Sequence, residues 1–370
     1  MLRTYDVGSL PLRVEEASIR EGARKSQTVL SLVGVSDEAS KVFESEVVSA
    51  FMDKLWTGMD IPNYPQFRDM NEMFFELIQG IKKEEGGYVA LRAPSAKPSS
   101  IIPEVDVLRK NASQIRDDAG IDKVRVKACL TGPYTLSSFF QAKTPKLFED
   151  LGHALADIVS RSIFDTRHGE VSLVCIDEPV IGFLNDPLLD YGSEGRGALR
   201  RAWDEVFRIA TAKGLETSMH LHDTSDDLFW EVEHLGIVES HVDDPLYAQE
   251  TTKRRLEDTD KRLKASISIT LFDKLIESHL RKEGRIGDIQ QGIGEVWDKI
   301  RLGRADPFTF IEDPALLMKR LRSVVERFGE ELVPYAGPEC GLGSWPTYET
   351  AFECLRRISK TIKAYNKNKR

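Results

Sequence analysis

The sequence lacks the features that mark membrane and secreted proteins. No apolar run approaches the roughly 18 residues from which a membrane-spanning helix can be inferred. Residues 1–6 contain no apolar core of the length found in signal peptides. We therefore expect a cytoplasmic protein that has no membrane partner.

Cysteine is scarce in this sequence. The four cysteines of the 370 residues lie far apart, without the paired spacing of a disulfide framework, at Cys129, Cys175, Cys340 and Cys354. In a reducing compartment such residues are free thiols or metal ligands. Three of them lie within apolar strand-like or helical stretches and are interpreted as small core residues. Cys340 therefore remains as the cysteine to consider for chemistry.

An excess of positive charge is also missing. Lys and Arg number 51 against 60 Asp and Glu, which gives a formal net charge of −9. The basic residues are scattered beside acidic ones, so we expect no surface for nucleic acid. The 41% content of hydrophobic residues is ample for a large core.

Internal repeats, low-complexity segments and Pro/Gly/Ser-rich linkers are absent, so no domain boundary is indicated. About eight alternations of strand-like and helix-like segments predict a parallel α/β sheet. The glycine-rich fingerprint of a dinucleotide-binding fold is missing, because only Val7-Gly8-Ser9 follows the first strand. Polar residues recur at the ends of many strands, and a barrel gathers such ends in one mouth. We predict a single (β/α)8 TIM barrel over residues 1–370, with extra helices.

The pattern also predicts individual elements. Residues 71–81 and 225–234 are typical of helices, and residues 82–97 of a hairpin or an irregular excursion. The charged stretch around residues 251–285 predicts a helical insertion into the barrel. Residues 286–297 carry a weaker strand signal.

Two strand ends carry side chains of the metal-ligand type. His220 and His222 are two residues apart, so both lie on the same side of a strand. Cys340 ends another apolar run, and glycines on both sides of it allow a sharp turn and a close approach. One imidazole and one thiolate make half of a zinc site. Taken alone, histidines in this pattern are more often hydrogen-bonded core residues, and a single cysteine is usually inert.

Carboxylates follow two further strands. Asp177 and Glu178 come directly after a buried strand, where a carboxylate can bind an amino group, serve as a base or cap a helix. Asp243 follows the next strand after His222, with His241 two residues before it, and is a candidate third metal ligand. These positions repeat the pattern of polar groups at strand ends.

Backbone groups complete the pattern at the first strand. Gly8 and Ser9 either offer N–H groups to a carboxylate or form a plain turn. The four strand ends carry, in order, the motifs GS, DEP, HxH and ECGL, and this ordered set is hard to obtain by chance.

The ordered set resembles the catalytic, C-terminal barrel of cobalamin-independent methionine synthase. The resemblance covers nearly the whole chain, through Asp6-Val7-Gly8-Ser9-Leu10-Pro11, Leu130-Thr131-Gly132-Pro133-Tyr134-Thr135, Ile176-Asp177-Glu178-Pro179, His220-Leu221-His222 and Gly337-Pro338-Glu339-Cys340-Gly341-Leu342. With one barrel, the chain is similar to the short archaeal-type forms that lack the family's N-terminal half. The resemblance implies a methyltransferase of methionine biosynthesis, in which zinc binds homocysteine as a thiolate and a folate or methyl-corrinoid protein donates the methyl group.

The resemblance also implies roles for individual residues. His222 and Cys340 correspond to zinc ligands, with Asp243 as a third and His220, His241 or Thr224 as possible fourth contacts. For the substrate, the implied contacts are backbone groups that hold the carboxylate, a carboxylate that holds the amino group, the glutamate that supports its loop, and one amide. These are Gly8 and Ser9, Asp177, Glu178 and Gln66, of which Asp177 and Glu178 are the predicted catalytic residues.

Three departures from the family pattern bear on the metal site and the mouth. Thr224 stands where the family has its second zinc cysteine, and Asp243 lies near the family's glutamate ligand. Residues 292–301 lack the family's catalytic histidine followed by serine, and residues 64–70 replace a glutamate-containing segment. Loss of one thiolate makes a metal centre less negative and a stronger Lewis acid. Three protein ligands and an open position would still be a catalytic zinc geometry.

Two other functions stay open at this point. One is a metal-free decarboxylase that resembles uroporphyrinogen decarboxylase, which needs a basic mouth for acidic side chains, with Arg68, Arg92 and Arg301 as its candidates. The other is a non-catalytic accessory protein, in which Thr224 marks a decayed site and the barrel binds a corrinoid protein or a methyltransferase.

Overall fold

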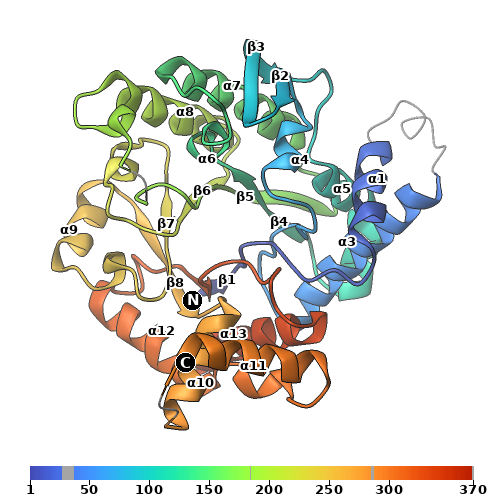
Figure 1. The fold of residues 1–370 in the computed structure, drawn as a ribbon, viewed down its shortest axis with the longest axis vertical. Coiled ribbons are helices and arrows are strands. Elements are labelled where there is room, and N and C mark those ends of the chain that lie inside the picture. The colour runs from blue at the N-terminus through green and yellow to red at the C-terminus, as the bar shows by residue number, and fades with distance from the viewer. Residues whose placement is uncertain (27–36, 184, 285–286, 369–370) are drawn as a thin grey trace.

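The strands of the protein form one curled parallel sheet. The computed structural model describes residues 1–26, 37–183, 185–284 and 287–368. Within this part, seven strands follow the order β1-β9-β8-β7-β6-β5-β4, and every neighbouring pair is parallel. The strands lie at the centre of the molecule with helices around them (Figure 1). Their bounds are Arg3–Thr4, Val124–Thr131, Gly169–Glu178, Glu216–Leu221, Ile237–Glu239, Arg262–Ser268 and Tyr335–Pro338, for β1 and β4 to β9. The predicted parallel α/β fold is confirmed.

Residues 61–66 connect the two ends of this sheet. Asn63 forms a parallel bridge with Lys127 of β4, and Gln66 forms one with Ser9, just beyond β1. The backbone N–H of Ile61 donates to the Thr4 carbonyl at 3.0 Å. The segment thus contacts both ends of the sheet through isolated bridges. The main sheet has seven regular strands among the described residues, where the sequence predicted eight.

The helices cover the outside of the sheet (Figure 1). Several begin at the residues that capping chemistry favours: Thr144 and Thr347 each accept a hydrogen bond from a backbone N–H of the first turn. The helices α1 and α3 to α13 span Glu16–Ser26, Glu38–Thr57, Glu72–Phe75, Pro103–Ala119, Pro133–Ser137, Pro145–Ser162, Glu194–Thr211, Glu250–Asp258, Phe272–Lys282, Ile289–Arg301, Pro314–Phe328 and Tyr348–Lys367. None of the described helices is long and apolar enough to cross a membrane.

An antiparallel hairpin stands apart from the main sheet. Strands β2 (Ile78–Glu84) and β3 (Gly87–Ala96) pair with each other, which confirms the hairpin predicted for residues 82–97. The helix predicted for residues 71–81 is correspondingly short, and α4 ends at Phe75. Residues from Ile78 onward belong to the hairpin instead of the helix, because Ile78 pairs with Ala96.

Three other element predictions are wrong. The stretch around 251–285 is not a helical insertion, because β8 lies in its middle between α9 and α10. The many charged residues of this stretch obscured the pattern of an apolar strand, which contains one lysine, Lys264. Of residues 286–297, those from Ile289 onward belong to α11 and not to a strand, and Ile286 lies outside the described residues. Residues 225–234 contain only the short 3-10 turn Leu228–Glu231.

Candidate metal and thiol site

The ends of β6 and β9 bring His222 and Cys340 together. His222 is the first residue after β6, and Cys340 lies two residues after the last residue of β9. The Cys340 Sγ atom is 3.5 Å from the His222 Nε2 atom. Both side chains are half-buried. The structure therefore joins the two residues that the sequence singled out.

His220 and His241 complete a group of four potential ligands. One ligand atom from each of His220, His222, His241 and Cys340 lies within 4.8 Å of all the others. The ring centroids of His222 and His241 are 4.3 Å apart, and those of His220 and His222 are 5.2 Å apart. We call this group the His3Cys cluster.

Asp243, the predicted third ligand, is not part of the His3Cys cluster. The chain turns after His241, and the backbone N–H of Asp244 donates to the His241 carbonyl at 3.0 Å. The turn carries Asp243 away to line a separate cavity with Arg320 and Arg327. The turn therefore separates Asp243 from the cluster, whereas His241, a possible fourth contact in the sequence interpretation, is one of its members.

Thr224 ties two mouth loops together. Its backbone N–H donates to the Asp244 Oδ2 atom at 3.1 Å, and its hydroxyl group donates to the Oδ1 atom of the same carboxylate. Asp244 also accepts from the backbone N–H of Leu246 at 2.7 Å. The Thr224 hydroxyl is thus engaged in loop structure.

The electrostatics of the His3Cys cluster suit a metal ion. Burial lowers the pKa of His220 to about 4 and that of His222 to about 2, so both imidazoles are neutral near pH 7. Both ring nitrogens of His220 and the Nε2 atom of His241 are buried without a hydrogen-bond partner in the described part of the chain. Burial raises the pKa of Cys340 to about 12, so its thiolate needs a nearby cation. Neutral imidazoles and a thiolate are the donors that zinc prefers.

Asp177 provides a buried carboxylate beside the His3Cys cluster. It lies near the end of β5, it is buried, and its Oδ1 atom has no hydrogen-bond partner among the described residues. Burial, and then the charge of Cys175, raise the pKa of Asp177 well above its usual value. Burial, and then the charge of Asp177, raise the pKa of Cys340. A cationic substrate group would satisfy this carboxylate.

Glu178, although adjacent in sequence, has a different role in the structure. Its carboxylate accepts hydrogen bonds from the backbone N–H groups of Tyr134 and Thr135 at 2.9 and 2.7 Å, and from the indole N–H of Trp203 at 2.7 Å. The Thr135 hydroxyl donates to it as well, at 2.6 Å. Glu178 therefore anchors the start of α6, which fits the predicted loop support and leaves its oxygens fully engaged.

A buried ion pair shapes the loop of Gly8 and Ser9. The Lys54 ammonium group donates to the Asp6 carboxylate at 2.7 Å and to the Gly8 carbonyl at 3.2 Å. Gly8 has a φ of +138°, and a Cβ atom there would lie 2.3 Å from the Oε1 atom of Gln66. Only glycine suits this position, and the predicted substrate contacts Gly8, Ser9 and Gln66 are indeed neighbours.

The same loop meets the segment that carries Cys340. The backbone N–H of Gly343 donates to the Ser9 hydroxyl at 3.3 Å. A Cβ atom on Gly341 would lie 1.9 Å from the Ser9 Oγ atom, so glycine allows this approach. The predicted metal and carboxylate contacts therefore belong to one continuous site.

Sequence reasoning missed three buried charged residues below this site: Lys127, Glu239 and Lys264, which lie on β4, β7 and β8 and are fully buried. A signal was available, because each is a charged residue inside an apolar strand sequence. In a barrel-like sheet, such a residue faces the interior and needs a buried partner.

The basic mouth needed for a decarboxylase is not available at Arg68. Its guanidinium group donates to both Glu104 carboxylate oxygens at 2.8 and 2.9 Å and to Glu76 at 3.0 Å. These contacts pair the Arg68 guanidinium with two carboxylates. The arginine is therefore not free to bind an acidic substrate side chain.

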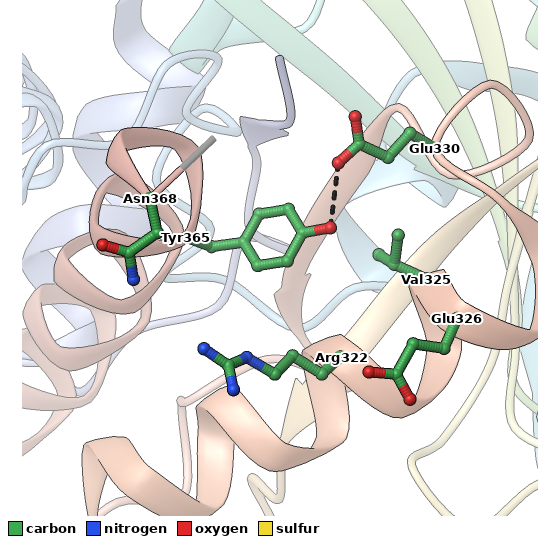
Figure 2. A pocket seen from close by; sticks show the side chains of 6 residues that line it. All are labelled: Arg322, Val325, Glu326, Glu330, Tyr365 and Asn368. Atoms are coloured by element: carbon green, nitrogen blue, oxygen red, sulfur yellow. Dashed lines mark hydrogen bonds between the residues drawn. The ribbon is translucent and has the colours of Figure 1, made fainter. Parts of the chain in front are cut away.

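A separate cavity of about 480 Å³ lies between α12 and α13, and Figure 2 shows its lining. The Tyr365 hydroxyl donates to the Glu330 carboxylate at 2.8 Å across this cavity, beside Arg322. None of the residues that line it is a histidine or a cysteine. It is therefore distinct from the His3Cys cluster.

Comparison with known proteins gives one consistent family. The family model described as the catalytic domain of cobalamin-independent synthase matches residues 2–273. A 5-methyltetrahydropteroyltriglutamate–homocysteine methyltransferase from Thermotoga maritima is 23% identical over 360 residues, covering 92% of this chain and 41% of the relative. A protein of the same name from Histophilus somni is 27% identical over 238 residues, covering 60% of this chain and 29% of the relative. The chain thus spans less than half the length of these curated relatives.

The fold is also similar to that of a solved structure. A solved B12-independent methionine synthase from Shewanella sp. W3-18-1, in complex with selenomethionine, matches with a TM-score of 0.62 at 14% identity. The match covers 100% of this chain and 98% of that one. At this level of identity, the likeness concerns the fold.

Proposed function

The chain belongs to the cobalamin-independent methionine synthase family, and on this premise we propose that it transfers a methyl group to the thiol of homocysteine. The single observation that carries the proposal is the approach of Cys340 Sγ to His222 Nε2, 3.5 Å apart within the His3Cys cluster. In the reaction, the bond between the methyl carbon and its donor breaks, a bond between that carbon and the substrate sulfur forms, and the thiol proton leaves.

We propose that the cluster holds zinc, with His222, His241 and Cys340 as ligands and His220 as the deepest fourth donor. The fit rests on the unpartnered ring nitrogens of His220 and His241 and on the neutral state of the imidazoles. When bound, zinc lowers the pKa of a coordinated thiol, so that a thiolate is present near neutral pH. A zinc site with three imidazole ligands and one thiolate ligand carries a more positive net charge than a zinc site with two thiolate ligands.

Asp177 and the Gly8–Ser9 loop are proposed to hold the amino-acid part of homocysteine. The unpartnered Asp177 Oδ1 atom suits the substrate ammonium group, which would supply the missing hydrogen bond. Backbone N–H groups at Gly8 and Ser9 suit the substrate carboxylate, with Gln66 beside them. Glu178 supports this site by holding the loop after β4 and does not contact the substrate.

Three further statements belong to the proposal. The methyl donor is a folate or a methyl-corrinoid protein. Residues 61–66 take the position of the eighth strand in a closed (β/α)8 barrel, and their bridges to both ends of the sheet support this. The protein acts in the cytoplasm, which fits the four cysteines that are free thiols in the structure.

The proposal is tested by combining metal analysis with methyl transfer. Protein purified without chelators is expected to contain about one zinc per chain and to form methionine from homocysteine with methyltetrahydrofolate or a methylated corrinoid protein. Cys340→Ser should lose zinc and homocysteine binding, whereas Cys354→Ser, a buried cysteine on α13, should keep both. A metal-free protein whose homocysteine binding is unchanged by Cys340→Ser would refute the proposal.

A further inference from the structure

A cavity lies between the loop that follows β7 and helix α12, and we call it the β7–α12 cavity. Its volume is about 350 Å³, which is within the range of small-molecule sites. One wall is formed by residues 242–244, directly after β7 and its turn. Another wall is a single face of α12, because its lining residues recur at helical spacing: Arg320, Ser323, Val324 and Arg327. The cavity is separate from the proposed metal and homocysteine contacts.

Four charged groups line the β7–α12 cavity, and two of them are already engaged by the protein itself. The Asp244 carboxylate accepts hydrogen bonds from the backbone N–H groups of Thr224 and Leu246 at 3.1 and 2.7 Å. The Arg320 guanidinium group donates to both carboxylate oxygens of Glu312, each at 2.8 Å. Asp244 and Arg320 therefore serve to hold the walls of the cavity.

The other two charged groups, Asp243 and Arg327, form no ion pair with any residue in the described part of the chain. They come from different walls of the cavity, the loop after β7 and α12, and they are not paired with each other. One N–H group of Arg327 donates to the Ala248 carbonyl at 2.7 Å, and a guanidinium group has five N–H donors in all. A carboxylate and a guanidinium group are thus available to one ligand.

The charge balance of the lining indicates the class of ligand. Two carboxylates and two guanidinium groups give the lining a net charge of zero. A simple anion would be repelled by Asp243, and a simple cation would be repelled by Arg327. A ligand that carries both charges can pair with both groups. Apolar side chains also line the cavity, from Val242, Ala248 and Val324, and they suit an apolar part of the same ligand.

We propose that the β7–α12 cavity binds a small α-amino acid with an apolar side chain, at a site separate from that of homocysteine. Arg327 receives the carboxylate, together with the hydroxyl group of Ser323 one turn earlier on the same helix face, and Asp243 receives the ammonium group. The apolar side chain of the ligand lies against Val324. Methionine, the product of the proposed reaction, belongs to this class of ligand, but the site does not depend on metal binding or on methyl transfer.

The first test measures binding of labelled methionine to the full chain by equilibrium dialysis. The Asp177→Asn background removes a proposed contact of the homocysteine site, so that the β7–α12 cavity can be followed by itself. In this background, Arg327→Gln and Asp243→Asn should each weaken methionine binding at least about tenfold, because each removes a hydrogen bond between charged groups. Arg322→Gln is the matched control: Arg322 also lies on α12 but lines the cavity of Figure 2, so binding should be unchanged.

The second test uses competing ligands and tests the class of ligand. Leucine and valine should displace methionine from this site, whereas methionine analogues that lack the ammonium group or the carboxylate should not. An analogue with a single charge that binds as tightly as methionine overturns the inference.

The inference is also overturned if Arg327→Gln and Asp243→Asn bind methionine as their parent does, or if the chain binds none of methionine, leucine and valine. Its failure can be told apart from failure of the proposed function. Methionine binding that depends on Arg327, in a protein that does not methylate homocysteine, overturns the proposed function alone. Methyl transfer without such binding overturns this inference alone.

Discussion

Cys340 and His222 are separated by 118 positions in the chain, yet the Cys340 Sγ atom lies 3.5 Å from the His222 Nε2 atom. The two residues follow strands β9 and β6, whose carboxyl ends meet at the same edge of the curled sheet. This approach places a soft sulfur donor among three imidazoles that burial keeps neutral. The chemistry that such a group favours is the binding of a thiophilic metal ion.

Replacement of His241 should separate a true ligand from a neighbour. His241→Ala is expected to weaken zinc binding by more than the roughly 10- to 100-fold typical of a supporting residue, because it removes a direct donor. Asp243→Ala, two residues further on, is the matched control and should bind zinc as the wild type does. Equal losses in the two variants, measured by chelator competition, would speak against the ligand assignment.

Asp177→Asn should make the protein more stable and weaken its binding of homocysteine. The raised pKa of Asp177 means that the folded state favours its protonated form, so wild-type stability falls as pH rises above about 4 toward the folded-state pKa. Removing the charge is expected to increase the free energy of unfolding by about 1–3 kcal/mol near neutral pH, the cost of an unsatisfied buried group.

The gain from Asp177→Asn should shrink as pH falls, since the wild-type carboxyl group is then protonated. Urea unfolding of the metal-free wild type and variant between pH 4 and 8 measures this difference. Homocysteine binding should weaken at the same time. If the gain in the free energy of unfolding, variant minus wild type, is smaller at pH 8 than at pH 4, the role of burial at this site is contradicted.

Gly8→Ala should disturb the substrate loop. A side chain at φ +138° is strained by about 1–3 kcal/mol, and its Cβ would displace Gln66. We expect a lower melting temperature and a KM for homocysteine raised at least about tenfold. Gly294→Ala on α11 is the control: nothing lies within 4 Å of the added Cβ, so stability should rise by about 0.5–1 kcal/mol with KM unchanged.

Lys54→Met should leave the Asp6 carboxylate buried and unpaired. Breaking such a pair typically costs about 3–5 kcal/mol, which urea unfolding can measure. The double variant with Asp6→Asn removes the stranded charge and should recover part of the loss. A double variant as unstable as Lys54→Met would show that packing of the lysine, and not the ion pair, is what stabilises the loop.

The sequence singled out His222 and Cys340 because each is a metal-type residue at the end of an apolar run. The structure brings the two side chains together, since both strands end at the same edge of the sheet. His241 was only a possible contact, because the end of β7 was placed too late: β7 stops at Glu239, and the turn after His241 removes Asp243.

The buried charges were beyond a local pattern. Lys264 sits in β8, but the charged residues on both sides of that strand made the whole stretch appear helical. Its partner Glu239 is 25 residues away, and only the parallel pairing of β7 with β8 brings them together. Long-range pairing decides such contacts, and the hydrophobic period of one segment carries no information about it.

The central claim is that this chain activates a substrate thiol on a metal held by the His3Cys cluster. X-ray absorption at the zinc edge, with and without homocysteine, tests it most directly. We predict one sulfur neighbour in the free protein, from Cys340, with nitrogen neighbours from the histidines, and a second sulfur when homocysteine is added. Zinc without a sulfur neighbour, or a sulfur count unchanged by saturating homocysteine, would contradict the account.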